Sequence, residues 1–125
     1  MLKDFFLVGC GSFVGGGMRF LISKWIQSLS MLAFPFGTMT INILGCLIVG
    51  FLSDLPLFGN LMNPTTKLIL ITGFCGGFTT FSTFMNENSS FMKDENYFYM
   101  ALYAFGSLAL GLLAIFAGQL LAKML

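Results

Sequence analysis

Charged residues are scarce in this chain, which has six Lys or Arg, five Asp or Glu and no His in 125 residues. Soluble domains carry about 25% charged residues, whereas this chain has 9% charged and 57% hydrophobic residues. So few charges cannot cover a water-soluble globule without leaving large apolar patches exposed. The composition therefore excludes a soluble fold and predicts a membrane protein.

The lack of His removes the usual general base of Ser and Cys hydrolases and a common zinc ligand. A net charge of +1 gives no electrostatic basis for binding nucleic acid. Cysteine is also scarce: Cys10, Cys46 and Cys75 lie in apolar stretches without CxxC spacing, where a thiol acts as a small hydrophobic group. We therefore expect neither an enzyme nor a nucleic-acid-binding protein.

Three polar stretches interrupt the apolar sequence, at residues 28–35, 54–67 and 86–96. A membrane-spanning helix needs about 20 mostly apolar residues. The segments between the breaks predict four spans, at about residues 4–29, 36–53, 66–85 and 97–122. We expect an all-α integral membrane protein in which residues 1–125 form a single transmembrane domain.

The cationic residues give no preferred orientation in the membrane. With four spans, three cations fall on each side, Lys3, Lys67 and Lys123 against Arg19, Lys24 and Lys93. The excess of cations that normally marks the cytoplasmic side is absent. This balance is typical of dual topology, in which copies insert both ways and pair antiparallel, although it also arises by chance where charges are few.

The first segment combines glycines with an Arg. Gly11 and Gly15 are spaced four residues apart, as in closely packed membrane helices, and no strand precedes them as a dinucleotide loop requires. Arg19 continues the same spacing inside the segment, where a cation is costly unless it snorkels or faces water. Arg19 therefore either reaches the membrane surface or attracts anions at a pore mouth.

The second segment carries Asn42 near its middle, one helical turn after Thr38. The Asn amide needs hydrogen-bond partners, which hydrocarbon does not supply. Two interpretations are equally open: Asn42 joins helices to each other, or it lines a polar path.

The third segment is a poor membrane helix because it is rich in glycines and hydroxyls. These residues are Gly73, Gly76, Gly77, Thr79, Thr80, Ser82 and Thr83. Interrupted membrane helices occur where freed backbone groups line a cavity, meet another subunit or bind an ion. We therefore expect the third helix to be broken near the middle of the membrane.

Aromatic rings accompany these hydroxyls. Phe74 and Phe78 are expected to pack against neighbouring helices, whereas Phe81 and Phe84 can turn their positive ring edges to an anion. In the fourth segment, Ser107 is an isolated hydroxyl. If it lies opposite Asn42, both side chains can donate hydrogen bonds to one ion.

Three motifs carry a resemblance to a known family. They are GxxxGxxxR at residues 11–19, GTxxxN at residues 37–42 and GFCGGFTTFSTF at residues 73–84, with Glu87 following. Together with the span count they resemble the Fluc/CrcB fluoride channels over the whole chain, and the third motif is the most specific.

The resemblance implies an antiparallel, dual-topology homodimer with two pores in the bacterial plasma membrane. Through these pores fluoride would leave the cell passively, relieving its toxicity. The resemblance further implies pore-lining roles for Asn42, Phe81, Ser82, Thr83, Phe84 and Ser107. Fluoride, lipid and a second copy of the chain are then the partners.

The resemblance also implies a structural sodium ion at the dimer interface, held by the main-chain carbonyls of Gly76 and Thr79. Carbonyl oxygens suit such a hard cation. Arg19 and Glu87 match charged positions near the vestibules of the family.

Two other functions compete with a channel. A small four-span multidrug antiporter needs a carboxylate within the membrane, and here every acidic residue is expected at a span end or in a connection, with Glu87 just after the third span. A non-transporting assembly protein fits the composition, but it leaves the hydroxyl-rich third segment unexplained.

Overall fold

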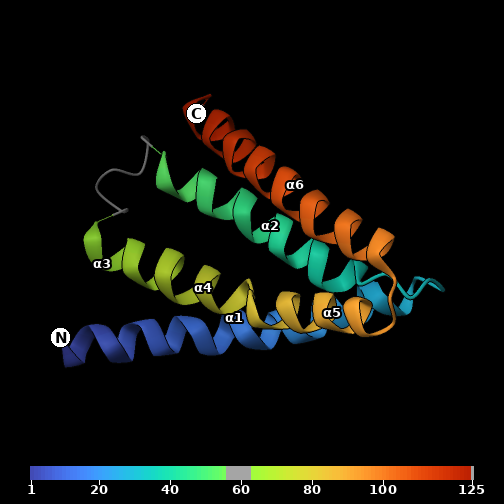
Figure 1. The fold of residues 1–125 in the computed structure, drawn as a ribbon. Helices are drawn as coiled ribbons and strands as arrows, with labels where there is room; N and C mark the ends of the chain where they lie inside the picture. Colours follow the sequence, from blue (N-terminus) through green and yellow to red (C-terminus); the bar gives the residue numbers. More distant parts are fainter. Residues whose placement is uncertain (56–62, 125) are drawn as a thin grey trace.

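The computed structural model describes residues 1–55 and 63–124. In these ranges every regular element is a helix, and residues 56–62 of the second predicted connection lie outside them (Figure 1). The elements, in chain order, are α1 (Leu2–Ser28), α2 (Phe36–Ser53), α3 (Pro64–Lys67), the π-helix η1 (Leu68–Cys75), α4 (Gly76–Phe78), α5 (Ser82–Lys93) and α6 (Tyr97–Lys123).

Four helical stretches are long and apolar enough to cross a membrane, as predicted. They are Leu2–Ser28, Phe36–Ser53, Pro64–Lys93 and Tyr97–Lys123. At 1.5 Å per residue, the 18 residues of the second stretch extend for about 27 Å, close to the hydrocarbon thickness. The all-α, four-span prediction is therefore confirmed.

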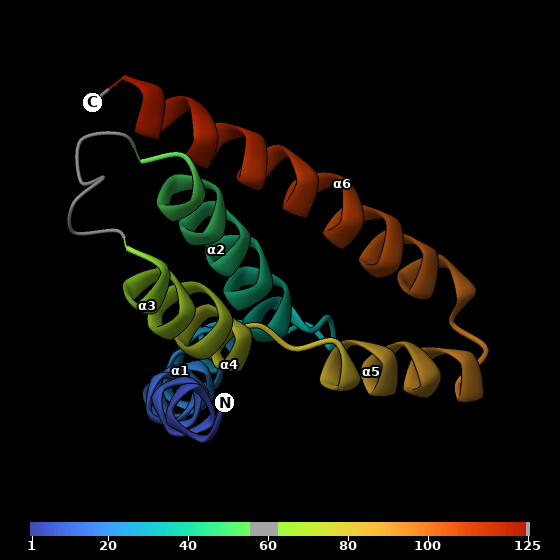
Figure 2. The same cartoon turned by 90° about the vertical axis from the view of Figure 1, so that its left-hand side faces the viewer.

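The third stretch is longer than predicted and is bent. We expected its helix to end near residue 85, but α5 continues to Lys93. It continues because Phe84, Asn88 and Phe91 recur on one face and are buried, so packing stabilises a helix whose other face is polar. Figure 2 shows α5 running away from α4 at an angle.

Polar side chains begin the last two spans. Asn63 Oδ1 accepts from the Thr66 N–H at 2.8 Å, and Pro64 occupies the first turn of α3. Asn96 Oδ1 likewise accepts from the Tyr99 N–H at 3.2 Å at the start of α6. In both places a side chain satisfies an N–H that has no partner inside its helix.

Glycines let α1 pack directly on the third span. A Cβ at Gly11 would lie 2.9 Å from the Phe74 nitrogen, and one at Gly77 would lie 2.7 Å from the Ser12 carbonyl oxygen. A Cβ at Gly15 would overlap the Phe74 carbonyl. These contacts confirm that the glycines serve helix packing.

The second and fourth spans form the other close pair. A Cβ at Gly50 of α2 would overlap the Ile115 carbonyl oxygen, and a Cβ at Gly118 of α6 would lie 2.7 Å from the Phe51 nitrogen. Figures 1 and 2 both show α2 and α6 side by side. The fold therefore consists of two helix pairs, α1 with η1 and α4, and α2 with α6.

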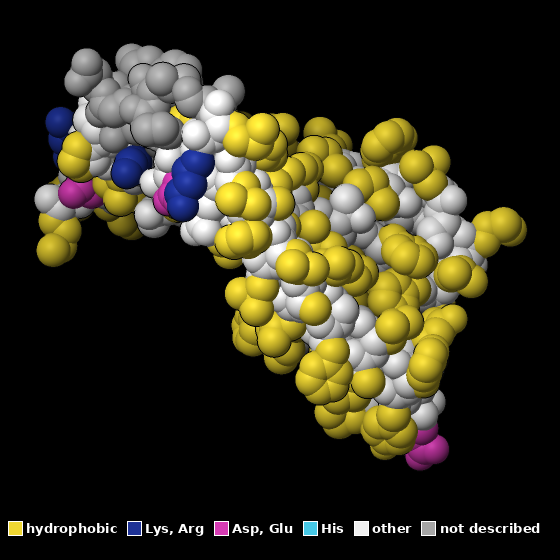
Figure 3. Space-filling view, turned by 90° about the horizontal axis from the view of Figure 1, so that it is seen from above, with side chains coloured by type: hydrophobic (Ala, Val, Ile, Leu, Met, Phe, Trp, Pro, Cys, Tyr) yellow, Lys and Arg dark blue, Asp and Glu magenta, His cyan; other side chains and the backbone are white. Residues whose placement is uncertain are grey.

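An aromatic cluster fills the end of the molecule where α5 meets α6. Its buried members are Phe34, Phe84, Phe91 and Tyr103. The outer surface is apolar as well: Phe13 is 83% exposed and Phe105 is 73% exposed. Figure 3 shows hydrophobic side chains spread over one face, with the visible charged ones near its ends, as a lipid-facing surface requires.

Replacing Gly15 with Ala is expected to destabilise the protein, because the new methyl group would overlap the Phe74 carbonyl and backbone cannot move aside cheaply. We expect a loss of about 1–3 kcal/mol. Thermal unfolding in detergent, followed by Trp25 fluorescence, measures it. The matched control is Gly17→Ala, because a Cβ there meets nothing within 4 Å; equal midpoints for the two variants would contradict the packing argument.

Candidate functional site

Helical hydrogen bonding stops at the bend of the third span. α4 ends at Phe78, Thr79 has extended backbone (φ −87°, ψ 160°), and the helix resumes at Ser82. Thr79 remains tied to the helix before it, because its N–H and its Oγ1 both donate to the Cys75 carbonyl, at 2.9 and 3.0 Å. The backbone of Thr80 therefore has to find partners elsewhere.

Asn42 supplies both partners. Its Nδ2 donates to the Thr80 carbonyl at 3.0 Å, and its Oδ1 accepts from the Thr80 N–H at 2.8 Å. In a continuous α-helix that N–H would bond to the Gly76 carbonyl. Asn42 thus takes the place of the helical bond and leaves the Gly76 carbonyl free of it.

The bend sits beside α2 because α2 has a glycine there. A Cβ at Gly45 would overlap the Thr79 methyl group. Gly45 follows Asn42 by three residues, so both lie on the α2 face that meets the third span. The GTxxxNxxG pattern therefore sets both the hydrogen bonds and the close approach.

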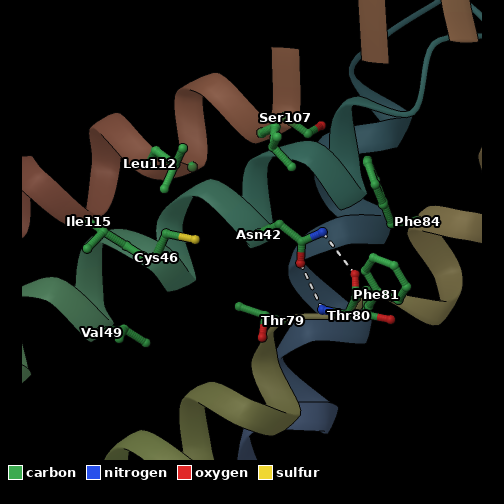
Figure 4. A pocket seen from close by; sticks show the side chains of 12 residues that line it. Asn42, Cys46, Val49, Thr79, Thr80, Phe81, Phe84, Ser107, Leu112 and Ile115 are labelled. Atoms are coloured by element: carbon green, nitrogen blue, oxygen red, sulfur yellow. Dashed lines mark hydrogen bonds between the residues drawn. The ribbon is translucent and has the colours of Figure 1, made fainter. Parts of the chain in front are cut away.

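A groove of about 570 Å³ opens between α2, the bend and α6 (Figure 4). Its twelve lining residues are Asn42, Cys46, Val49, Thr79, Thr80, Phe81, Phe84, Ser107, Leu108, Gly111, Leu112 and Ile115. Polar groups lie at the end near Asn42, while Val49, Leu112 and Ile115 make the other end apolar. The Ser107 hydroxyl oxygen is buried and has no hydrogen-bond partner among the described residues.

The two phenylalanines of the groove lie in different surroundings. Their ring centroids are 6.2 Å apart with the planes inclined at 44°. Phe84 is 8% exposed and packs on Tyr103 with centroids 4.9 Å apart, whereas Phe81 is 72% exposed. Contacts within the chain therefore hold the Phe84 ring in place, whereas most of the Phe81 ring lies on the surface.

Next to Phe84, Glu87 joins three elements. Its Oε1 accepts from the Tyr103 hydroxyl at 2.7 Å, and its Oε2 accepts from the Thr38 hydroxyl at 3.1 Å. Our expectation that Glu87 follows the third span was wrong: it lies within the stretch Pro64–Lys93, since α5 continues past it. Nothing in the sequence pairs Thr38 or Tyr103 with Glu87, although each is a polar residue inside an apolar helix.

The family model described as "CrcB-like protein, Camphor Resistance (CrcB)" matches residues 6–119. The chain belongs to the CrcB family. It is 46% identical over 124 residues to a fluoride-specific ion channel FluC of Chlorobaculum tepidum, covering 99% of this chain and 98% of the relative.

Other CrcB relatives carry the same name. A fluoride-specific ion channel FluC of Chlorobium chlorochromatii is 45% identical over 117 residues, with 94% of this chain and 90% of the relative covered. One from Azobacteroides pseudotrichonymphae is 41% identical, with 98% of each chain covered. The expected family is therefore confirmed over nearly the full length, and it is a family of channels and not of enzymes.

In this CrcB chain the groove unites part of the predicted set. Asn42, Thr79, Phe81, Phe84 and Ser107 all line it. The other predicted residues lie outside the lining: Ser82, Thr83 and Gly76 are exposed at the bend, Glu87 lies beyond Phe84, and Arg19 lies on α1. A Cβ at Gly16 would lie 4.0 Å from both the Arg19 guanidinium and the Gly77 carbonyl oxygen, so Arg19 is beside the contact between α1 and α4.

Replacing Asn42 with Leu is expected to lower the free energy of unfolding, because the Thr80 N–H and carbonyl both lose their partner. Each unpaired buried backbone group costs about 1–3 kcal/mol. Thermal unfolding in detergent measures the loss. The control is Cys46→Ala, one turn along the same groove and away from the Thr80 backbone; if both variants unfold alike, Asn42 does not hold the bend.

Proposed function

We propose that this protein is a fluoride channel, which lets fluoride leave a bacterium passively across its plasma membrane. The observation that carries the proposal is the groove, which sets an amide, an unpaired hydroxyl and two aromatic rings side by side in a chain of the CrcB family. Relatives that match nearly all of the chain are named as fluoride-specific channels.

The chemistry of the groove suits a small anion. Fluoride holds its water strongly, so a pore has to replace that water with hydrogen-bond donors. The Asn42 amide has two N–H groups and uses one on the Thr80 carbonyl, which leaves the other for an ion. The Ser107 hydroxyl donates from α6, and the positive ring edges of Phe81 and Phe84 complete the lining.

A second, antiparallel copy completes each pore in this proposal. Phe81 is 72% exposed, and Ser82 and Thr83 beside it are also exposed, so the open side of the groove lacks a wall. The even division of cations between the two sides of the membrane allows copies to insert both ways. Symmetry then gives two pores, with Ser82 and Thr83 supplying hydroxyls along them.

A sodium ion on the two-fold axis would hold the two copies together. The Gly76 carbonyl is free of its helical bond because Asn42 takes the Thr80 N–H, and Thr79 has extended backbone beside it. Two carbonyls from each copy make a set of oxygen ligands, which suits a hard cation. The ion would neutralise carbonyl dipoles at the interface and has no part in moving fluoride.

Native mass spectrometry of the detergent-solubilised protein tests both of these assignments. We expect two chains and one retained sodium ion, because a site on the two-fold axis is shared by two copies. A monomer would contradict the completed pore. A dimer free of sodium would contradict the assignment of Gly76 and Thr79 alone.

Charged side chains would act at the two mouths. Arg19 lies inside the α1 span beside α4, where a cation attracts anions towards the bend. Glu87 already accepts two hydrogen bonds and does not line the groove, so it is not placed to exchange protons with a cationic drug bound there. This arrangement favours a channel over a multidrug antiporter, and the groove itself disfavours a purely structural protein.

Fluoride efflux from liposomes tests the function directly. Vesicles containing the protein are loaded with potassium fluoride, a potassium ionophore is added, and a fluoride electrode follows the release. We expect fast fluoride release and no chloride release from parallel vesicles loaded with potassium chloride, because a chloride ion is too large for donors set around fluoride. Folded protein that releases no fluoride would exclude the channel function.

Replacing Phe81 or Phe84 with Ile is expected to lower fluoride efflux about tenfold, because the ring edges are lost while most apolar volume is kept. Phe84→Ile should also lower the unfolding temperature, since that ring is buried, whereas Phe81→Ile should not. Phe105→Ile is the control, because Phe105 is an exposed α6 residue outside the groove. Normal efflux in both groove variants would remove the role assigned to the ring edges.

A further inference from the structure

Gln27 joins the end of α1 to the start of α2. Its Nε2 donates to the Phe34 carbonyl at 2.9 Å, and its Oε1 accepts from the Gly37 N–H at 3.0 Å. The amide therefore satisfies one backbone acceptor and one backbone donor, as Asn42 does at the bend. One side chain thus fixes the connection between the first two spans relative to α1.

The bond to Gly37 caps α2 from outside the helix. The residue before the helix, Pro35, makes no side-chain hydrogen bond to it, and the first N–H groups of a helix have no partner inside it. Gly37 also lies so close to the Ser23 carbonyl that a Cβ would overlap it. The first turn of α2 is thereby held against α1.

The bond to Phe34 orients a buried ring. The Phe34 carbonyl also accepts from the Phe36 N–H at 2.9 Å, across a turn in which Pro35 has φ −80° and ψ 69°, close to an inverse γ-turn. The Phe34 ring is 5% exposed and packs edge-on against Tyr103 with centroids 5.5 Å apart. Tyr103 in turn packs on Phe84.

Both bonds of Gln27 therefore lead to residues of the proposed pathway. Through Phe34 and Tyr103 the amide supports the Phe84 ring in the groove. Through Gly37 it holds the turn that carries Thr38, whose hydroxyl donates to Glu87. Gln27 itself does not line the groove.

We propose that Gln27 is a positioning residue for anion selectivity, acting through Phe84 and Glu87. The proposal rests on the proposed fluoride-channel function and deepens it by naming a side chain outside the groove that sets its geometry. Without the amide, the residues between α1 and α2 are no longer tied to the end of α1. The rings of Phe34 and Tyr103 then support Phe84 less firmly. The groove then discriminates less well between fluoride and larger anions.

Reversal potentials across planar bilayers, with fluoride on one side and chloride on the other, test the selectivity. Gln27→Met keeps the length of the side chain but loses both hydrogen bonds. We expect its reversal potential to shift in the direction that a higher permeability to chloride, relative to fluoride, produces. We also expect fluoride efflux to fall about three- to tenfold, as the loss of one or two hydrogen bonds predicts. An unchanged reversal potential in folded Gln27→Met would overturn the proposal.

The matched control is Ser28→Ala, at the same end of α1. The Ser28 hydroxyl donates only to the Trp25 carbonyl of its own helix, so its removal should leave the reversal potential unchanged. A shift as large as that of Gln27→Met would mean that any change at this end of α1 disturbs the channel, which would also overturn the proposal.

A spectroscopic measurement separates this proposal from the channel function itself. 4-Fluorophenylalanine incorporated at position 84 gives a ¹⁹F resonance that senses the Tyr103 ring beside it. We expect Gln27→Met to move or broaden this resonance and Ser28→Ala to leave it unchanged. If the unmodified protein conducts no fluoride, the proposed function fails, whereas an unmoved resonance in Gln27→Met removes the positioning role whatever the protein conducts.

A second variant covers the case in which Gln27→Met does not fold. Gln27→Glu keeps an oxygen to accept from the Gly37 N–H, and so keeps the cap of α2, but it loses the donor to the Phe34 carbonyl. We expect it to fold and to move both the reversal potential and the ¹⁹F resonance. If it folds and moves neither, the bond to Phe34 does not position Phe84.

Discussion

The paired hydrogen bonds between Asn42 and the Thr80 backbone are the interaction on which the rest of the site depends. A helix cannot stop inside a membrane unless its freed N–H and carbonyl groups find partners, because lipid supplies none. A single amide meets that need here, since one of its two N–H groups donates to the Thr80 carbonyl while its oxygen accepts from the Thr80 N–H. The bend, the free Gly76 carbonyl and the groove beside Phe81 all exist because this exchange of partners is possible.

Two side-chain amides, those of Asn42 and Gln27, each satisfy one backbone N–H and one backbone carbonyl. Asn42 ties α2 to the bend, and Gln27 ties α1 to the beginning of α2. The shorter side chain acts where Gly45 lets the backbones approach, and the longer one spans a connection. The hydroxyls of Thr38 and Tyr103 both donate hydrogen bonds to the Glu87 carboxylate. Among the described residues, the buried side-chain atoms without a hydrogen-bond partner are the Ser107 hydroxyl oxygen, in the groove, and the Asn88 Oδ1, on α5.

The sequence predicts the spans well because length and hydropathy act locally; the second, residues 36–53, matches α2 at both ends. It predicts the end of the third span poorly, since the polar stretch after Met85 looks like a loop until burial of Phe84 and Phe91 is known. The sequence leaves Asn42 with two open interpretations because its partner is a backbone group. Every residue carries such groups, so the residue types do not show which one is the partner. The sequence does not predict a structural role for Gln27 for the same reason. The residue types of Leu68–Cys75 likewise do not indicate a π-helix.

The helix pairs described above are interleaved along the chain: the first span packs mainly on the third, and the second on the fourth. During synthesis, α1 and α2 therefore emerge from the ribosome before either has its main partner. Until Pro64 and the residues after it have been inserted, the faces of α1 and α2 that meet those partners are open to lipid, which their apolar sequences permit. Assembly of the tertiary structure is thus a late event in biogenesis, and a truncated nascent chain without α6 leaves the Gly50 face of α2 open to lipid.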